Sequence, residues 1–136
     1  MTTCCGFFQP TQNLVNAFKT NANGLPFLDT WNDVEIPGDN SADFTGAVDP
    51  RLDHSVGRDG VPYLDWGLHN PQYVRDRAYA GPFTPKKQSP YKSENGTLTW
   101  SNNPRMNANN YRLIRLSHVI LWLAEVETQI GSLEKA

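Results

Sequence analysis

The sequence predicts a mainly α-helical scaffold, of which this chain supplies one long and one short helix, with irregular loops and a short β-hairpin laid against them. Apolar residues recur at helical spacing over 113–130 and cover an arc of roughly 200°, wider than the stripe of about 100° on an ordinary surface helix. The chain of 136 residues also contains 10 Gly and 10 Pro, nearly all of them before Tyr111. Such a composition indicates turns and loops over most of the chain.

The short helix is expected within 9–24. Thr11 is a suitable N-cap, Leu14 and Phe18 lie on the apolar side, and Asn23-Gly24 ends the segment. Further along, Asp49 followed by a proline predicts a one-turn helix start, because proline suits the first helical position.

The hairpin is expected around Asp59-Gly60, the strongest hairpin turn signal in the chain. Val56 leads into this turn, and Val61 and Tyr63 lead out of it. A second turn signal stands at Asn95-Gly96, with an apolar segment after it.

The long helix has too wide an apolar arc for one neighbour, and we expect helices on two of its sides, as in a stacked array. Leu123-Ala124 fits the Leu-Gly pair of the tetratricopeptide pattern, and Gly131 supplies the turn between helices. A lone helical hairpin is the alternative. Glu127 points into the arc near the helix end. Because the chain stops at Ala136, one turn into the next helix, we expect it to be a piece of a larger protein.

Composition and charge exclude several classes of function. The net charge is −2 and no basic stripe occurs, so nucleic acid is not an expected partner. Cys4 and Cys5 are adjacent, which excludes a disulfide framework. The three histidines are far apart and show no metal-ligand spacing, and we expect neither a metal nor another cofactor.

Four stretches resemble, in order, segments of the SusD/RagB family of glycan-binding outer-membrane lipoproteins. They are GFFQPTQNLVNAF at 6–18, DPRLDHSVGRDGVPY at 49–63, YAGPFTPKK at 79–87, and YRLIRLSHVILWLAEVETQIGSLEKA at 111–136. The resemblance implies a partial SusD-like α-superhelix of tetratricopeptide-like helices. We expect one partial domain over 1–136, loop-rich over 1–110, with the scaffold helix and the start of the next helix over 111–136.

Family members begin with a signal peptide and a lipidated cysteine. No signal precedes Cys4 or Cys5, and neither is assigned as the lipidation site. The resemblance implies a receptor at the cell outer membrane, attached only through the lipid anchor of the full-length protein. Such a receptor captures glycan, passes it to a SusC-type TonB-dependent transporter and does not cleave it.

Sugar binding needs flat aromatic faces and a few convergent polar groups. The loop aromatics and their polar neighbours supply candidates, with Trp66 expected to be more exposed than the nearby tyrosine because glycine follows it directly. The predicted ligand-binding residues are Trp66, Tyr63, Trp100, Asp65 and Asn70. The alternative is that such aromatics only pin loops to the scaffold.

Arg51 is expected to tie a loop through carboxylates or carbonyls, and Lys86-Lys87 to form a solvated face. Two other functions compete with that of a receptor. A glycosidase needs two facing carboxylates, but the aspartates here stand in cap and turn contexts. A helical-repeat protein-interaction module without sugar binding is the second rival, and oligosaccharide titration separates it from a receptor.

Overall fold

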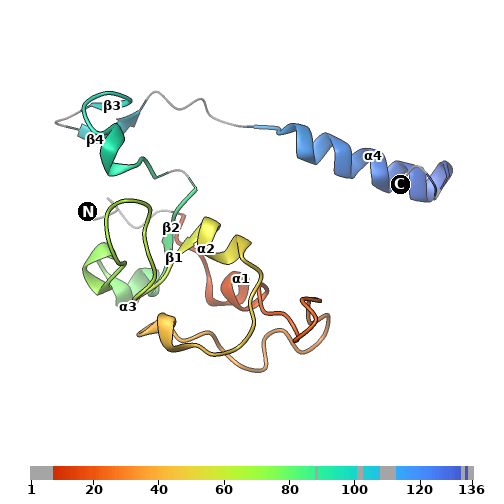
Figure 1. The fold of residues 1–136 in the computed structure, drawn as a ribbon, viewed down its shortest axis with the longest axis horizontal. Helices are drawn as coiled ribbons and strands as arrows, with labels where there is room; N and C mark the ends of the chain where they lie inside the picture. The colour runs from red at the N-terminus through yellow and green to blue at the C-terminus, as the bar shows by residue number, and fades with distance from the viewer. Residues whose placement is uncertain (1–7, 88, 101–102, 108–112, 133, 135–136) are drawn as a thin grey trace.

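The computed structural model describes residues 8–87, 89–100, 103–107, 113–132 and 134 (Figure 1). Short elements and long loops dominate it as far as residue 107, and a single long helix follows. In chain order the elements are α1 (Gln12–Asn16), η2 (Ser41–Asp43), α2 (Arg51–Ser55), β1 (Val56–Gly57), η3 (Pro71–Tyr73), α3 (Arg77–Ala80), β2 (Thr84–Pro85), η4 (Lys92–Glu94), β3 (Thr99–Trp100), β4 (Asn103–Asn107) and α4 (Leu116–Ile130).

Helix α1 begins where the sequence predicts. The Thr11 side chain accepts a hydrogen bond from the backbone N–H of Leu14, 3.2 Å away. The helix ends at Asn16, earlier than expected, because Lys19 forms a bridge with Val48, which draws the chain into extended pairing. The expected turn at Gly24 is present, with φ at +79°.

A small apolar core joins α1, α2, β1 and the loops beside them. Val15, Ile36, Leu52, Val56 and Phe83 are buried in it, and Phe18, Phe44 and Val48 pack against its edge. We call the region around this core, residues 8–98, the body.

Strand β1 pairs antiparallel with β2, with Val56 opposite Pro85 and Gly57 opposite Thr84. The predicted hairpin of Val56 with Val61 and Tyr63 is therefore wrong. The turn at Gly60 does form, with φ at +81°, but the chain after it pairs with itself, since the N–H of His69 donates to the carbonyl of Val61 at 3.0 Å. Pro62, which has no N–H, cannot extend a ladder to β1.

Gly57 allows the close approach of β1 and β2. A Cβ atom there would lie 2.3 Å from Oγ1 of Thr84 and 2.6 Å from the ring of Tyr63. A short hairpin does occur, but between β3 and β4, after the second turn signal. Gly96 has φ at +83°, and Thr99 pairs with Asn107 across the hairpin.

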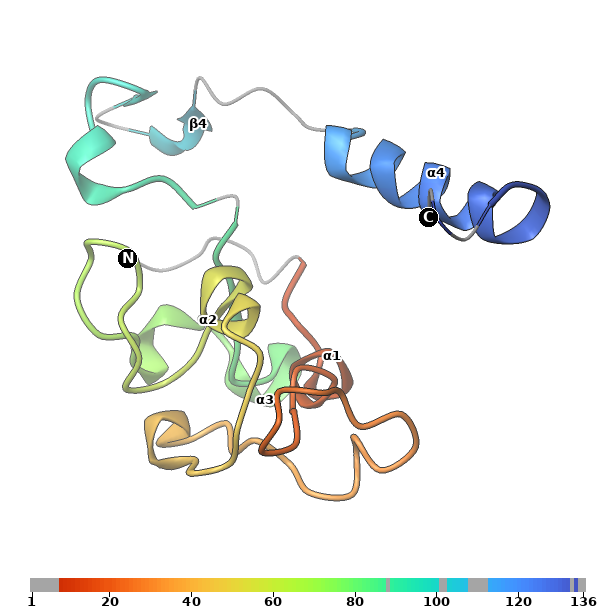
Figure 2. The same cartoon turned by 45° about the vertical axis from the view of Figure 1, so that its right-hand side comes forward.

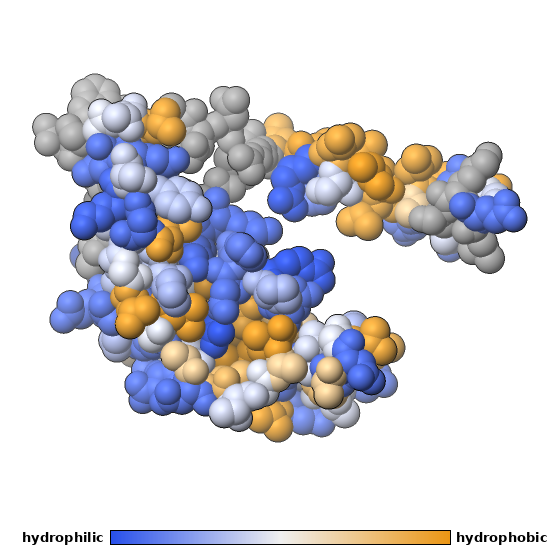
Figure 3. Space-filling view, viewed as in Figure 1, coloured by the Kyte–Doolittle hydropathy of each residue, from blue (hydrophilic) through white to orange (hydrophobic). Residues whose placement is uncertain are grey.

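Helix α4 confirms the predicted long helix, beginning at Leu116 rather than Leu113 and ending before Gly131. Figures 1 and 2 show it lying apart from the body. None of its residues is buried, and apolar surface gathers along it (Figure 3). Glu127, expected to break the apolar arc, instead accepts a hydrogen bond from the N–H of Ser132 at the helix end, 3.1 Å away. The superhelical stacking around α4 stays a prediction.

Candidate functional site

A tight turn presents two of the predicted ligand-binding residues. The N–H of Tyr63 donates to the carbonyl of Gly67 at 2.8 Å, and that of Trp66 donates to the carbonyl of Tyr63 at 3.1 Å. Leu64 has φ at +52° and Gly67 has φ at +97°, so the chain reverses sharply within this loop. The turn thereby brings Asp65 and Trp66 together at its tip.

Tyr63 and Trp66 differ in exposure. Tyr63 is 1% exposed, and its hydroxyl lies 2.7 Å from the Pro85 carbonyl and 2.6 Å from the Ser89 hydroxyl. Burial raises the pKa of this phenol, and its hydrogen bond with Ser89 partly offsets that rise. Trp66 is half-buried, and its Nε1–H donates to the Pro90 carbonyl at 2.9 Å. Trp66 is thus the more exposed of the two, as expected.

Asp65 and Asn70 use their side chains to hold backbone. The carboxylate of Asp65 accepts from the N–H groups of Lys92 and Ser93, at 2.5 and 2.8 Å. Desolvation acts to raise the pKa of this carboxyl, but the hydrogen bonds from Ser93 and Lys92 outweigh it and lower the pKa. The amide oxygen of Asn70 accepts from the N–H of Gln72 at 3.0 Å, capping η3.

The fifth predicted residue, Trp100, ends strand β3, and its side chain lies outside the described part. Cys4 and Cys5 also lie outside the described residues. The structure therefore holds Asp65 and Trp66 against segment 90–93, while Tyr63 is buried and Asn70 caps η3.

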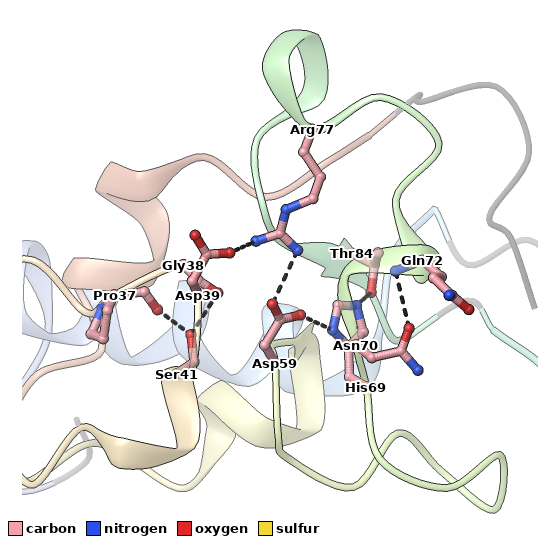
Figure 4. A network of polar contacts seen from close by, with 10 residues as sticks. All are labelled: Pro37, Gly38, Asp39, Ser41, Asp59, His69, Asn70, Gln72, Arg77 and Thr84. Carbon is pink, nitrogen blue, oxygen red and sulfur yellow. Dashed lines mark hydrogen bonds and ion pairs between the residues drawn. The ribbon is translucent and has the colours of Figure 1, made fainter.

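A buried polar network anchors this loop to β2 (Figure 4). Nδ1 of His69 lies 2.8 Å from a carboxylate oxygen of Asp59, and its Nε2 lies 3.0 Å from the hydroxyl of Thr84. Arg77 donates to the second oxygen of Asp59 at 3.1 Å and also pairs with Asp39. Burial lowers the pKa of His69, and although Asp59 opposes this, the imidazole is held towards its neutral form.

The Thr84–His69–Asp59 arrangement has the order of a hydroxyl–imidazole–carboxylate triad. A catalytic triad needs a nucleophile that reaches its substrate. Thr84 is 0% exposed and His69 is 1% exposed. Because solvent does not reach Thr84 or His69 and Gly57 packs closely against Thr84, this network is structural rather than catalytic. We call the network of Asp39, Asp59, His69, Arg77 and Thr84 the brace, because it fixes the loop.

Sequence reasoning missed this brace, since its members are spread over residues 39–84 and no short motif unites them. It also placed Lys86 wrongly. Lys86 is 9% exposed and donates to the carbonyls of Asp53 and Pro62 at 2.6 and 2.7 Å, because β2 carries it under the loop. Burial lowers the pKa of its ammonium group. Only Lys87 of that pair is exposed.

Arg51 ties the chain as expected. Its Nε lies 2.9 Å from each carboxylate oxygen of Asp49, and this contact lowers the pKa of Asp49 to about 2. A second arginine, Arg58, binds both oxygens of Asp53, at 2.7 and 3.0 Å, and the carbonyl of Ser41 at 2.8 Å. Both arginines therefore hold loops rather than stand free for a ligand.

In the described ranges, no three His, Cys, Asp or Glu side chains converge as metal ligands would. Within the same ranges, no helix is both long and apolar enough to cross a membrane.

Comparison with known proteins identifies the family of the chain. A family model described as the SusD family matches residues 2–136. No curated protein matches the sequence. Because the family match spans all but the first residue, the chain belongs to the SusD family, whose members bind glycans for nutrient uptake.

Proposed function

We propose that this protein binds oligosaccharides at the surface of the outer membrane and passes them to a SusC-type TonB-dependent transporter without cleaving them. The full-length protein is held at the membrane by a lipid anchor. Family membership supports glycan binding in general. The transporter partner, the anchor and the absence of catalysis are part of the proposal.

The observation that carries a specific site is the setting of Trp66. Its Nε1–H is bonded to the Pro90 carbonyl, so one edge of the indole is fixed while the side chain stays partly exposed. A flat ring fixed at one edge loses little conformational freedom when a sugar ring stacks on its face. Asp65, Asn70 and Trp100 are proposed to complete the site, with Tyr63 supporting it from below.

The carboxylates favour binding over catalysis. A glycosidase uses two carboxyl groups facing each other across the scissile bond. The aspartates of residues 49–76 that sit in caps and turns each hold another group of this chain. They are Asp49 with Arg51, Asp53 with Arg58, Asp59 with His69 and Arg77, Asp65 with the N–H groups of 92–93, and Asp76 with the N–H of Tyr79.

The test is calorimetric titration of the protein with oligosaccharides derived from starch, xylan and mannan. Trp66→Ala should weaken binding of the recognised sugar about tenfold, because an aromatic contact contributes on the order of 1–2 kcal/mol and about 1.4 kcal/mol equals a factor of ten. Trp66→Phe, which keeps a ring, should lose less. Tyr79→Ala is the matched control, since Tyr79 is an exposed aromatic of α3 outside this loop.

The alternative is a protein-interaction module, and the exposed apolar face of α4 is the observation that favours it. If no sugar binds to the protein but the SusC-type partner does, the protein is an interaction module and not a glycan receptor. If Trp66→Ala lowers the melting temperature and leaves affinity unchanged, Trp66 is a packing residue.

A further inference from the structure

A pocket of about 530 Å³ opens beside the loops between α1 and α2, away from the Trp66 turn. These loops form one edge of the body in Figure 1. The volume falls within the range of about 300–1,000 Å³ that is usual for small-ligand sites. Its walls are formed by Lys19, Thr20, Phe27, Thr30, Asp33, Val34, Phe44, Thr45, Gly46 and Ala47.

Two phenyl rings contribute to the apolar part of the walls, together with Val34 and Ala47. Phe27 is 39% exposed, so much of its side chain is open to solvent. Phe44 packs on the edge of the core and lies against Gly46, where a Cβ would come within 2.4 Å of its ring tip. The ring of Phe44 is therefore held in place by the core edge and by Gly46.

The polar side chains of the pocket have hydrogen-bonding capacity to spare. In the described part of the chain, the side chains of Thr30, Asp33 and Thr45 make no hydrogen bond or ion pair. This is the reverse of the Trp66 loop, where Asp65 and Asn70 are already bound to backbone N–H groups. Unspent hydroxyl and carboxylate groups can bind a ligand without first breaking an internal contact.

The walls themselves are held firmly. The ammonium group of Lys19 donates to the Val34 carbonyl, and the N–H of Thr20 donates to the carbonyl of Ala47 at 3.0 Å. Buried Asn16 accepts from the N–H of Ile36 at 3.0 Å and donates to Asn32 at 2.7 Å. The two sides of the pocket are thus tied to the start of the body before any ligand arrives.

We propose that this pocket is a second glycan site, which takes a short neutral oligosaccharide between Phe27 and Phe44. Sugar hydroxyls bond to Thr30, Thr45 and Asp33, while the apolar face of a pyranose lies on the exposed phenyl ring. The walls carry one carboxylate, on Asp33, and one ammonium group, on Lys19, which already donates to the Val34 carbonyl. These opposite charges offset each other, which favours a neutral sugar, and the Asp33 carboxylate accepts bonds from sugar hydroxyls while disfavouring a uronic acid beside it. The class of ligand rests on the proposed function, whereas the location rests on the pocket.

The experiment titrates the protein with cellobiose, maltose, mannobiose and digalacturonic acid by calorimetry. Phe27→Ala and Thr45→Val should each weaken binding of the preferred neutral disaccharide, by about tenfold and about fivefold respectively. Asp33→Asn should reduce the discrimination against digalacturonic acid. Leu28→Ala is the matched control, because Leu28 follows Phe27, is 81% exposed and does not line the pocket.

Melting temperatures separate binding from folding. Thr45→Val changes one exposed hydroxyl and preserves shape, so it stays informative if Phe27→Ala unfolds the loop. The second glycan site is refuted if Thr45→Val and Asp33→Asn bind sugars as the wild type does while Trp66→Ala loses affinity. That outcome leaves the proposed function unaffected. If none of the four sugars nor the longer oligosaccharides binds, both proposals fail together.

Discussion

The body and helix α4 differ in which side chains they bury. The body has few regular elements and a small apolar core, yet it buries charged and polar side chains such as Arg58, Asp59 and His69 with partners for each. Helix α4 is fully regular, but its apolar side chains remain exposed, Leu123 by 57% and Ile120 by 56%.

Different contacts maintain the two regions. Loops without ladders must satisfy their backbone groups through side chains, and in the body Lys86, Tyr63 and Asp65 do so. Helix α4 satisfies its own backbone, so its stability depends on what covers its apolar face. A stretch of exposed apolar surface of this kind is typical of surfaces that other helices or proteins cover.

The largest expected effect contrasts the two regions directly. Phe83→Ala should lower the free energy of unfolding by about 3–5 kcal/mol, because it empties a wholly buried position in the core. Leu123→Ala in α4 should change it by less than about 0.5 kcal/mol, because that side chain already faces solvent. Urea unfolding followed by circular dichroism measures both. A large loss at Leu123 would show that α4 is covered in solution.

Local signals explain what the sequence could predict. Thr11 caps α1, Asp49 accepts from the N–H of Arg51 at the start of α2, and Gly131 follows the last residue of α4. Each of these features depends on neighbours within a few residues, so the capping residues can be recognised in the sequence.

Long-range pairing was not predictable in the same way. The turn at Gly60 forms, but Val56 pairs with Pro85, which lies 29 residues further along the chain. The brace of Asp59, His69 and Arg77 joins three separate segments. Of the candidate site, the prominence of Trp66 was foreseen from the glycine after it, but the commitment of Asp65 to segment 92–93 was not.

The second effect tests the buried polar contacts of the body. Arg58→Ala should cost about 2–3 kcal/mol, since it leaves the Ser41 carbonyl and the Asp53 carboxylate without their donors, and the side chain of Asp53 regains some water at 37% exposure. Arg51→Ala is the matched control at an exposed pair and should leave chemical denaturation unchanged. Equal losses in the two variants would contradict a body held by buried polar contacts.

The third effect concerns pH and the brace. His69 faces Asp59 and Thr84 directly and experiences the charges of Arg77 and Lys86, and its pKa in the folded protein lies below the ordinary value of 6.5. Protonation then favours the unfolded chain, so stability from this group is complete above pH 6.5 and is lost as pH falls from 6.5 towards the folded pKa.

The melting temperature measured at pH 7.5, 6.5 and 5.5 should therefore fall towards acid pH. His69→Gln keeps a polar side chain that does not titrate, and it should flatten the slope even if its melting temperature is lower throughout. A variant with the same slope as the wild type would assign the acid sensitivity to another group.

The smallest expected effect compares the two helix starts. The N-cap of α1 is Thr11, whose side chain bonds to the N–H of Leu14, whereas the N-cap of α4 is Arg115, which makes no side-chain cap bond. Thr11→Ala should destabilise the body by about 1 kcal/mol. Arg115→Asp should stabilise the first turn of α4 by a similar amount, because a carboxylate at the N-cap can accept an N–H of that turn and suits the positive end of the helix dipole. Hydrogen exchange reads each region separately: amides 14–16 should exchange faster in the first variant, and amides 117–119 slower in the second.

Slower exchange in α4 without a change in the body would show that the two regions are stabilised independently. An Arg115→Asp variant with unaltered exchange would mean that the first turn of α4 is already held by contacts outside the helix.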